Sequence, residues 1–300
     1  MTTDLAQPLL LRAFPSRRIC SPETAFGSPR EFLNNRFVYV VVSARARGLS
    51  IGVNLNPDKR CNFDCGYCEV NRILPAREEE LDSAVMAEEL RQTLALAHAG
   101  RLRDIASYSN VPAELLRLRH VTLSGDGEPT LCPNFVEAVL AVMHVRAVGM
   151  FPFFKVVLIT NATGLDLPEV QRGLKFFTQQ DEVWAKLDAG TQAYMDKVNG
   201  PGCSLDKVLA NILFVSRHRP VVIQSLFPLL NGEEPPVEEI EQYVQRLREL
   251  KEAGSQIPLV QIYSATRPAS HSDCGHLPLK ALSRIARCVR EVTGLKSEVF

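Results

Sequence analysis

The sequence predicts an α/β protein whose mainly parallel sheet forms either an incomplete barrel or an open sheet. Six short apolar segments alternate with six segments of helical periodicity along the 300 residues. This alternation requires helical crossovers between parallel strands. Six units are fewer than the eight of a closed barrel. Every polar motif follows an apolar segment, at the strand ends where such folds carry their chemistry.

The expected strands are short runs rich in Val, Ile and Leu. A strand at 36–46, rich in Val and Tyr and alternating in polarity, precedes the repeating units. The strands of the six units follow in order at 50–54, 120–124, 155–160, 182–187, 221–226 and 259–263.

The expected helices repeat apolar residues three and four positions apart. In the fifth, for example, Val237, Ile240 and Val244 share one face, and Gly100 and Gly149 end the first two helices. The six helices lie at 80–99, 134–148, 167–178, 205–217, 237–253 and 278–293.

The domain division follows from the start of this repeat. Residues 1–49 are expected to form an N-terminal arm and strand extension, because 1–35 carry scattered Pro and Arg without periodicity. Residues 50–300 form the expected core domain. The stretch 102–118 is irregular and indicates no function.

Charge and cysteine content narrow the class of protein. The sequence has 34 Lys and Arg residues and 34 Asp and Glu residues, so its net charge is zero. A neutral chain favours neither a nucleic-acid-coating nor a membrane-surface role, although it is compatible with a local basic patch. No apolar stretch approaches the ~20 residues of a membrane helix, and the N-terminus lacks a signal-peptide core. Three of eight cysteines cluster, as in metal-binding proteins of reducing compartments. We therefore expect a cytoplasmic protein.

The cysteine loop is the most specific feature of the sequence. Cys61, Cys65 and Cys68 follow the strand at 50–54. Thiolates are soft ligands that suit iron–sulfur clusters or zinc. In a ferredoxin each iron of a [4Fe–4S] cluster takes a thiolate, so three cysteines alone would leave one iron open to an outside molecule. There are two alternatives. One is a zinc site completed by a distant fourth ligand, and the other is three cysteines that bind no metal.

The Cys-x3-Cys-x2-Cys pattern, with Tyr67 just before the third cysteine, resembles the radical S-adenosylmethionine (radical SAM) superfamily. The resemblance implies a partial (β/α)6 TIM-like barrel with an N-terminal extension. It also implies a [4Fe–4S] cluster on the three cysteines, shielded by Tyr67, with S-adenosylmethionine on the open iron. Reductive cleavage would give a 5′-deoxyadenosyl radical that abstracts hydrogen from an unidentified substrate.

The loop Gly125–Asp126–Gly127–Glu128 follows the second strand of the repeat. Glycines let a backbone approach a ligand closely, and the carboxylate could receive an ammonium group. The loop resembles the family's Gly-Gly-Glu-Pro element, which implies contact with the amino group of the methionine moiety. A strand-to-helix turn is the alternative. Because the cysteines lie on another loop, a side chain added at Gly127 is expected to weaken cofactor binding alone.

Polar residues at two further strand ends complete the predicted cofactor site. The resemblance implies that Lys186 balances the carboxylate of S-adenosylmethionine, that Asp188 takes a ribose hydroxyl and that Asn161 lies nearby. The alternative is that these polar residues have no ligand and only mark the points where the strands end at the solvent. Backbone atoms of Ile262 or Tyr263 are expected to contact adenine.

Five motifs follow the strands of the repeat, namely Asn54-x-Asn-Pro, Ser-Gly-Asp-Gly-Glu-Pro-Thr at 124–130, Thr-Asn-Ala at 160–162, Lys-Leu-Asp-Ala-Gly at 186–190 and Tyr263-Ser-x-x-Arg-Pro. With them, residues 50–300 are similar to standalone iron–sulfur oxidoreductases akin to tRNA wyosine synthases. The expected partners are an electron donor such as flavodoxin or ferredoxin and the substrate, with no membrane and no favoured nucleic acid. The rival functions are an electron carrier or cluster scaffold, and a zinc-stabilised interaction domain. A second metal site is not expected, because the remaining cysteines lack cluster spacing. We interpret His271, Asp273, Cys274 and His276 as a surface loop.

Overall fold

The computed structural model describes residues 32–72, 74–76, 78–266 and 273–300, so most of the expected N-terminal arm lies outside them. Eight strands form one sheet in the order β1-β2-β3-β4-β5-β6-β8-β10. β1 runs antiparallel to β2, and the other neighbours run parallel. The strands are β1 (Val38–Ser43), β2 (Gly48–Asn54), β3 (Leu118–Ser124), β4 (Lys155–Thr160), β5 (Glu182–Lys186), β6 (Val221–Leu226), β8 (Val260–Tyr263) and β10 (Ser297–Val299).

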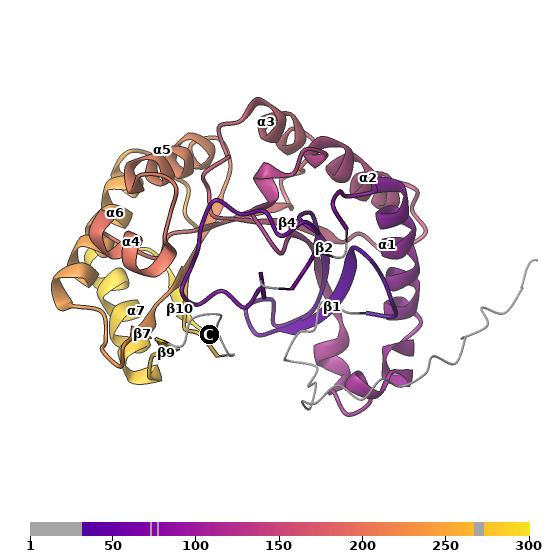
Figure 1. Ribbon diagram of the computed structural model, residues 1–300, viewed down its shortest axis with the longest axis horizontal. Helices are drawn as coiled ribbons and strands as arrows, with labels where there is room; N and C mark the ends of the chain where they lie inside the picture. The colour runs from indigo at the N-terminus through magenta and orange to yellow at the C-terminus, as the bar shows by residue number, and fades with distance from the viewer. Residues whose placement is uncertain (1–31, 73, 77, 267–272) are drawn as a thin grey trace, which may run out of the picture.

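The sheet curls into an arc with the helices on its outer side (Figure 1). This is the incomplete barrel, the first of the two expected arrangements, and the strand extension is β1. The six expected helices are present as α1 (Ser83–His98), α2 (Phe135–Ala147), α3 (Pro168–Leu174), α5 (Leu205–Ser216), α6 (Val237–Glu252) and α7 (Leu279–Thr293).

The sequence analysis missed several short elements. They are the helix α4 (Gln192–Asn199), the strand β10, and a two-stranded ribbon of β7 (Pro228–Leu230) and β9 (Cys274–His276). The irregular stretch before β3 contains the 3-10 turns η1 (Arg101–Asp104), η2 (Ala106–Tyr108) and η3 (Ala113–Leu116), and η4 (Pro129–Leu131) follows the glycine-rich loop. Each element is eight residues or fewer, too short for a periodic pattern to register.

The turn between β1 and β2 links opposite edges of the sheet. The Arg45 guanidinium lies 4.2 Å from the centre of the Tyr263 ring on β8. The Arg47 guanidinium is 2.7 Å from the Glu298 carboxylate on β10. Since β1 and β10 are the two edge strands, these contacts bridge the open side of the incomplete barrel.

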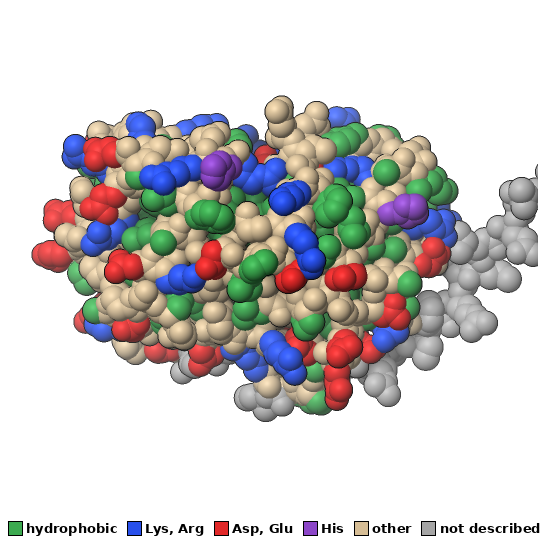
Figure 2. Space-filling view, turned by 90° about the horizontal axis from the view of Figure 1, so that it is seen from above, with side chains coloured by type: hydrophobic (Ala, Val, Ile, Leu, Met, Phe, Trp, Pro, Cys, Tyr) green, Lys and Arg blue, Asp and Glu red, His purple; other side chains and the backbone are tan. Residues whose placement is uncertain are grey.

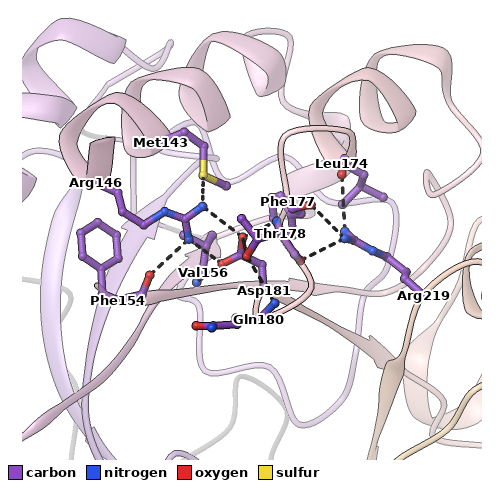
Figure 3. A network of polar contacts seen from close by, with 10 residues as sticks. All are labelled: Met143, Arg146, Phe154, Val156, Leu174, Phe177, Thr178, Gln180, Asp181 and Arg219. Atoms are coloured by element: carbon purple, nitrogen blue, oxygen red, sulfur yellow. Dashed lines mark hydrogen bonds and ion pairs between the residues drawn. The ribbon is translucent and has the colours of Figure 1, made fainter. Parts of the chain in front are cut away.

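A buried ion pair fixes the amino ends of β4 and β5 (Figure 3). Asp181 accepts hydrogen bonds of 2.7 and 3.1 Å from Arg146, of 2.8 Å from the Val156 amide and of 2.7 Å from the Thr178 amide. The expected helix at 167–178 ends earlier, at Leu174, and Thr178 instead bonds Asp181 in the loop before β5. Burial alone would raise the pKa of Asp181, but these donors outweigh it and lower the pKa.

We expect Asp181→Ala to lower the free energy of unfolding by about 3–5 kcal/mol, because it leaves Arg146 buried without its partner. In the parent, the stabilisation from Asp181 should be present above the unfolded-state pKa of about 3.9 and be lost as pH falls through the lower folded-state pKa. Urea unfolding at several pH values measures both effects. Glu169→Gln breaks the exposed pair with Arg172 and should change stability by no more than about 1 kcal/mol. An equal effect of both variants would contradict this account.

The face of the molecule seen from above has no dominant charge (Figure 2). Figure 2 shows basic and acidic side chains interspersed with apolar ones on the face seen from above, as the equal numbers of charges lead one to expect. In the described ranges, no helix is long and apolar enough to cross a membrane.

Candidate functional site

The cysteine loop leaves the carboxyl end of β2 and docks on the end of α4. The Val198 and Asn199 carbonyls, in the last turn of that helix, accept 2.9 Å hydrogen bonds from the Gly66 and Asp64 amides. Carbonyls in a last helical turn have no partner within the helix, so the loop satisfies them. The Gly202 amide donates to the Asn62 carbonyl at 2.9 Å. The loop is therefore shaped by backbone contacts on both sides of Cys65.

The three thiols of this loop are free and partly buried. Burial raises the pKa of Cys65 to about 12, although its Sγ accepts a hydrogen bond from Asn199 at 3.4 Å. Burial also raises the pKa of Cys61, against the 3.4 Å hydrogen bond from the Phe63 amide. Such thiols ionise when a metal binds, because the ligand must lose its proton.

The donor set fits an iron–sulfur cubane. Within the part of the chain that the structure describes, no three His, Cys, Asp or Glu side chains lie close enough to hold one metal ion. A cubane makes no such demand, since each of its thiolates binds a different iron. Three thiolates on one loop would leave the fourth iron without a ligand from the loop.

The glycine-rich loop packs directly against the cysteine loop. The Glu128 amide donates to the Arg60 carbonyl at 2.9 Å. A Cβ added at Gly127 would lie 1.6 Å from that carbonyl oxygen. The expectation that Gly127 can be changed without affecting the cysteines was therefore wrong, because the residue before Cys61 would have to move. Sequence distance concealed this contact, since 67 positions separate Arg60 from Gly127.

An unpartnered acceptor lies beside the same loop. Asn56 is 2% exposed, and its Oδ1 is buried with no hydrogen-bond partner. A Cβ added at Gly125 would lie 2.4 Å from this oxygen. A buried acceptor without a donor is costly, and a bound ammonium or hydroxyl group would satisfy it.

The Glu128 carboxylate is occupied by donors from the protein. It accepts hydrogen bonds from the Thr130 amide at 3.1 Å, the Thr130 hydroxyl at 2.6 Å, the Thr160 hydroxyl and the Asn161 amide at 2.7 Å. Burial raises the pKa of Glu128 despite these bonds. The side chain thus ties the glycine-rich loop to the end of β4.

Asp126 and Asn161 also hold the loops together. Asn54 Nδ2 donates to the Asp126 carboxylate at 2.7 Å, and the Asp126 amide donates to Asn54 Oδ1 at 2.9 Å. Asn161 Nδ2 donates to Asn62 Oδ1 at 2.8 Å. The carboxyl ends of β2, β3 and β4 are therefore joined by side-chain amides around the first cysteine.

A second cluster joins the end of β5 to the cysteine loop. Lys186 Nζ lies 3.0 Å from Asp188 Oδ1 and donates to Tyr263 Oη at 2.9 Å. Tyr67 donates a short hydrogen bond to Asp188 Oδ2 and lies under the Lys186 ammonium, 4.8 Å from its ring centre. Burial opposes the charge on Lys186, but Asp188 and Tyr263 keep its pKa raised. Burial and the neighbouring Asp188 charge raise the pKa of Tyr67.

Asn199 connects this cluster to a thiol, and the sequence analysis missed it. Its Nδ2 lies 2.9 Å from Asp188 Oδ2, 3.0 Å from Tyr67 Oη and 3.4 Å from Cys65 Sγ. The residue is 2% exposed. The available signal was an asparagine before Gly200, which takes the left-handed conformation that ends α4.

The surface loop expected around His271 and His276 has a partial outcome. His271 lies outside the described residues, while Asp273 and His276 are exposed. Cys274 is only partly exposed, and Cys274–His276 form β9, so the interpretation as a surface loop was wrong for these residues. A Cβ added at Gly66 would lie 2.8 Å from Cys274 Sγ, so this thiol packs on the cysteine loop.

Comparison with known proteins points to one superfamily. The family model for the radical SAM superfamily matches residues 55–247. A UPF0026 protein of Helicobacter pylori is 30% identical over 189 residues, which are 61% of this chain and 53% of that protein. One from Synechocystis is 27% identical over 179 residues, 58% of this chain and 57% of its own length. The chain thus spans about half the length of the curated relatives it matches.

Solved structures share the fold at low identity. A radical SAM methyltransferase from Sphaerobacter thermophilus has a TM-score of 0.58 at 15% identity, covering 88% of this chain and 68% of that one. Streptococcus suis SuiB bound to S-adenosylmethionine has a TM-score of 0.56 at 16% identity, covering 81% and 49%. TYW1 with a bound lysine–pyruvate adduct has a TM-score of 0.53 at 16% identity, covering 84% and 75%.

Proposed function

The chain belongs to the radical SAM superfamily, and from this premise we propose that Cys61, Cys65 and Cys68 hold a [4Fe–4S] cluster for a radical SAM reaction. When bound, the cluster with S-adenosylmethionine on its open iron supplies reductive cleavage to methionine and a 5′-deoxyadenosyl radical, which takes a hydrogen atom from the substrate. The observation that carries the proposal is the three-thiol loop, fixed on one side by the glycine-rich loop and on the other by α4.

The other residues of the site bind and orient in this proposal. The backbone of Gly125 and the free Oδ1 of Asn56 would receive the ammonium of the methionine moiety. The Lys186 ammonium offers a positive charge for its carboxylate, and Asp188 holds that ammonium in position. Tyr67 covers the side of the loop that faces Lys186 and limits the access of water to it.

An electron donor and a cellular compartment also belong to the proposed function. We propose a flavodoxin or ferredoxin as the electron donor and a reducing, cytoplasmic setting, in keeping with free thiols throughout the described chain. The branch akin to tRNA wyosine synthases stays a proposal as well, since the likeness to TYW1 concerns the fold.

Anaerobic reconstitution with iron and sulfide, followed by dithionite and S-adenosylmethionine, tests the function. We expect a cluster absorbance and the formation of 5′-deoxyadenosine, resolved by chromatography. A cluster without 5′-deoxyadenosine would favour the electron carrier or scaffold. Uptake of zinc without iron would contradict both iron–sulfur functions.

Asn199→Leu should make the cluster harder to reduce without removing it. Hydrogen bonds to cluster sulfurs help to set reduction potentials, and the variant removes the donor to Cys65 Sγ. If the hydrogen bond stabilises the reduced cluster by about 1 kcal/mol more than the oxidised one, its loss should lower the one-electron reduction potential by about 40 mV. Spectroscopic redox titration measures the shift. Gln192→Leu, at the other end of α4, serves as the control and should leave the potential unchanged. Equal potentials in parent and Asn199→Leu protein would refute this role.

A further inference from the structure

A cavity of about 410 Å³ opens at the end of the sheet opposite the cysteine loop. It is lined by the end of α1, by the turns that follow it, by the start of β3 and by residues 152–154. The turns after α1 form the lower right of Figure 1. The volume lies within the range of small-molecule sites. The cavity and the glycine-rich loop lie at opposite ends of β3, whose seven residues span about 20 Å of extended chain.

The cavity carries uncompensated positive charge. Its lining includes Arg103, Arg117 and Arg119 and contains no aspartate or glutamate. In the described part of the chain, none of the three arginines forms an ion pair. Guanidinium groups brought together without a counter-charge favour the binding of an anion, and their donors match phosphate geometry.

Two of these guanidinium groups are held in place by backbone carbonyls. Arg103 donates to the Val111 carbonyl at 3.0 Å, and Arg119 donates through Nε to the Arg47 carbonyl at 3.0 Å. A guanidinium has five N–H groups, so each anchored side chain keeps donors for a ligand. Anchoring also lowers the entropic cost of binding.

An aromatic residue lines the same cavity as the arginines. Phe153 lines the cavity and is 54% exposed, although it is a large apolar side chain. The Arg146 guanidinium covers this ring at 4.9 Å. Arg146 also donates to the Phe154 carbonyl at 3.2 Å, so the buried pair with Asp181 holds this part of the lining (Figure 3). An exposed ring beside fixed cations suits a ligand that has a flat face and an anionic group.

We propose that this cavity binds a phosphorylated small molecule with a flat ring, such as a nucleotide. The phosphate would meet Arg117 and Arg119, and the ring would pack against Phe153. At about 20 Å along β3, the ligand is separate from the radical chemistry. The site therefore adds a second binding function that does not depend on the cluster.

Calorimetric titration of the full, anaerobically purified chain at low salt tests the proposal with ADP, adenosine and pyrophosphate. ADP should bind, pyrophosphate should bind more weakly, and adenosine should not bind. The double variant Arg117→Gln, Arg119→Gln should lower the affinity for ADP at least tenfold. Phe153→Ser should lower the affinity for ADP and leave the affinity for pyrophosphate unchanged.

The matched control removes two positive charges elsewhere. Arg91 and Arg172 are exposed arginines paired with Glu88 and Glu169, and Arg91→Gln, Arg172→Gln should bind ADP like the parent. Failure of ADP to bind the parent, or equal affinity in the Arg117, Arg119 variant, would overturn the proposal. A single-stranded RNA oligonucleotide that bound tighter than ADP would also overturn it, because the site would then serve a nucleic acid.

Discussion

Cys65→Ala is expected to abolish the retention of iron after anaerobic reconstitution. A cubane that loses one of three thiolates has two irons without protein ligands. Cys65 is also the thiol to which the Asn199 amide, at the end of α4, donates a hydrogen bond. Metal analysis and the cluster's visible absorbance measure the loss, and we expect it to be nearly complete.

The control for this variant is Cys288→Ala. Cys288 is a partly buried, free thiol on α7, packed on the core away from the cysteine loop. It should retain iron and absorbance like the parent. If Cys288→Ala lost iron as fully as Cys65→Ala, the assignment of the cluster to this loop would have to be abandoned.

Asp188→Ala is expected to have the largest effect on stability among substitutions at the site. The carboxylate accepts hydrogen bonds from Tyr67, Asn199 and the Leu226 amide and pairs with Lys186. Its removal leaves a buried ammonium without its counter-charge, which costs about 3–5 kcal/mol. Denaturant unfolding of the iron-free protein measures the loss directly. Production of 5′-deoxyadenosine should fall with it.

The double variant Lys186→Met, Asp188→Leu separates charge from packing. It removes both members of the pair, so part of the lost stability should return, because buried pairs are often replaceable by apolar residues. Activity should stay low, since the proposed partner of the S-adenosylmethionine carboxylate is gone. A double variant less stable than Asp188→Ala would show that Lys186 does not depend on Asp188 for its burial.

Sequence patterns predicted the repeating units because each carries a local signal. The strands at 155–160 and 221–226 match β4 and β6 at both ends, since each is a short run rich in Val and Ile, followed by Asn161 in the first case and preceded by Pro220 in the second. The cysteine loop was visible because three cysteines lie within eight positions. Its supports were not visible, because Asn199 contacts Cys65 across 134 positions of sequence. Such partners become apparent only when the sheet brings the strand ends together.

The role of Glu128 shows a second limit of sequence patterns. A glutamate after a glycine-rich turn resembles a residue that meets a ligand directly, yet its carboxylate is bonded to Thr130, Thr160 and the Asn161 amide. Sequence spacing indicates which residues gather at a site, but not which of them face inward. Burial and the count of available donors decide that, and both depend on the tertiary structure.

The docking of the cysteine loop on α4 has a consequence for how the protein is made in the cell. Zinc fingers stay unfolded until metal arrives, because metal binding supplies their folding energy. Here the loop is shaped by the carbonyls of Arg60, Val198 and Asn199, which need no metal. If the loop holds the proposed cluster, folding would therefore not have to wait for iron and sulfide, and a chain whose cluster is lost would keep the loop contacts needed for reloading.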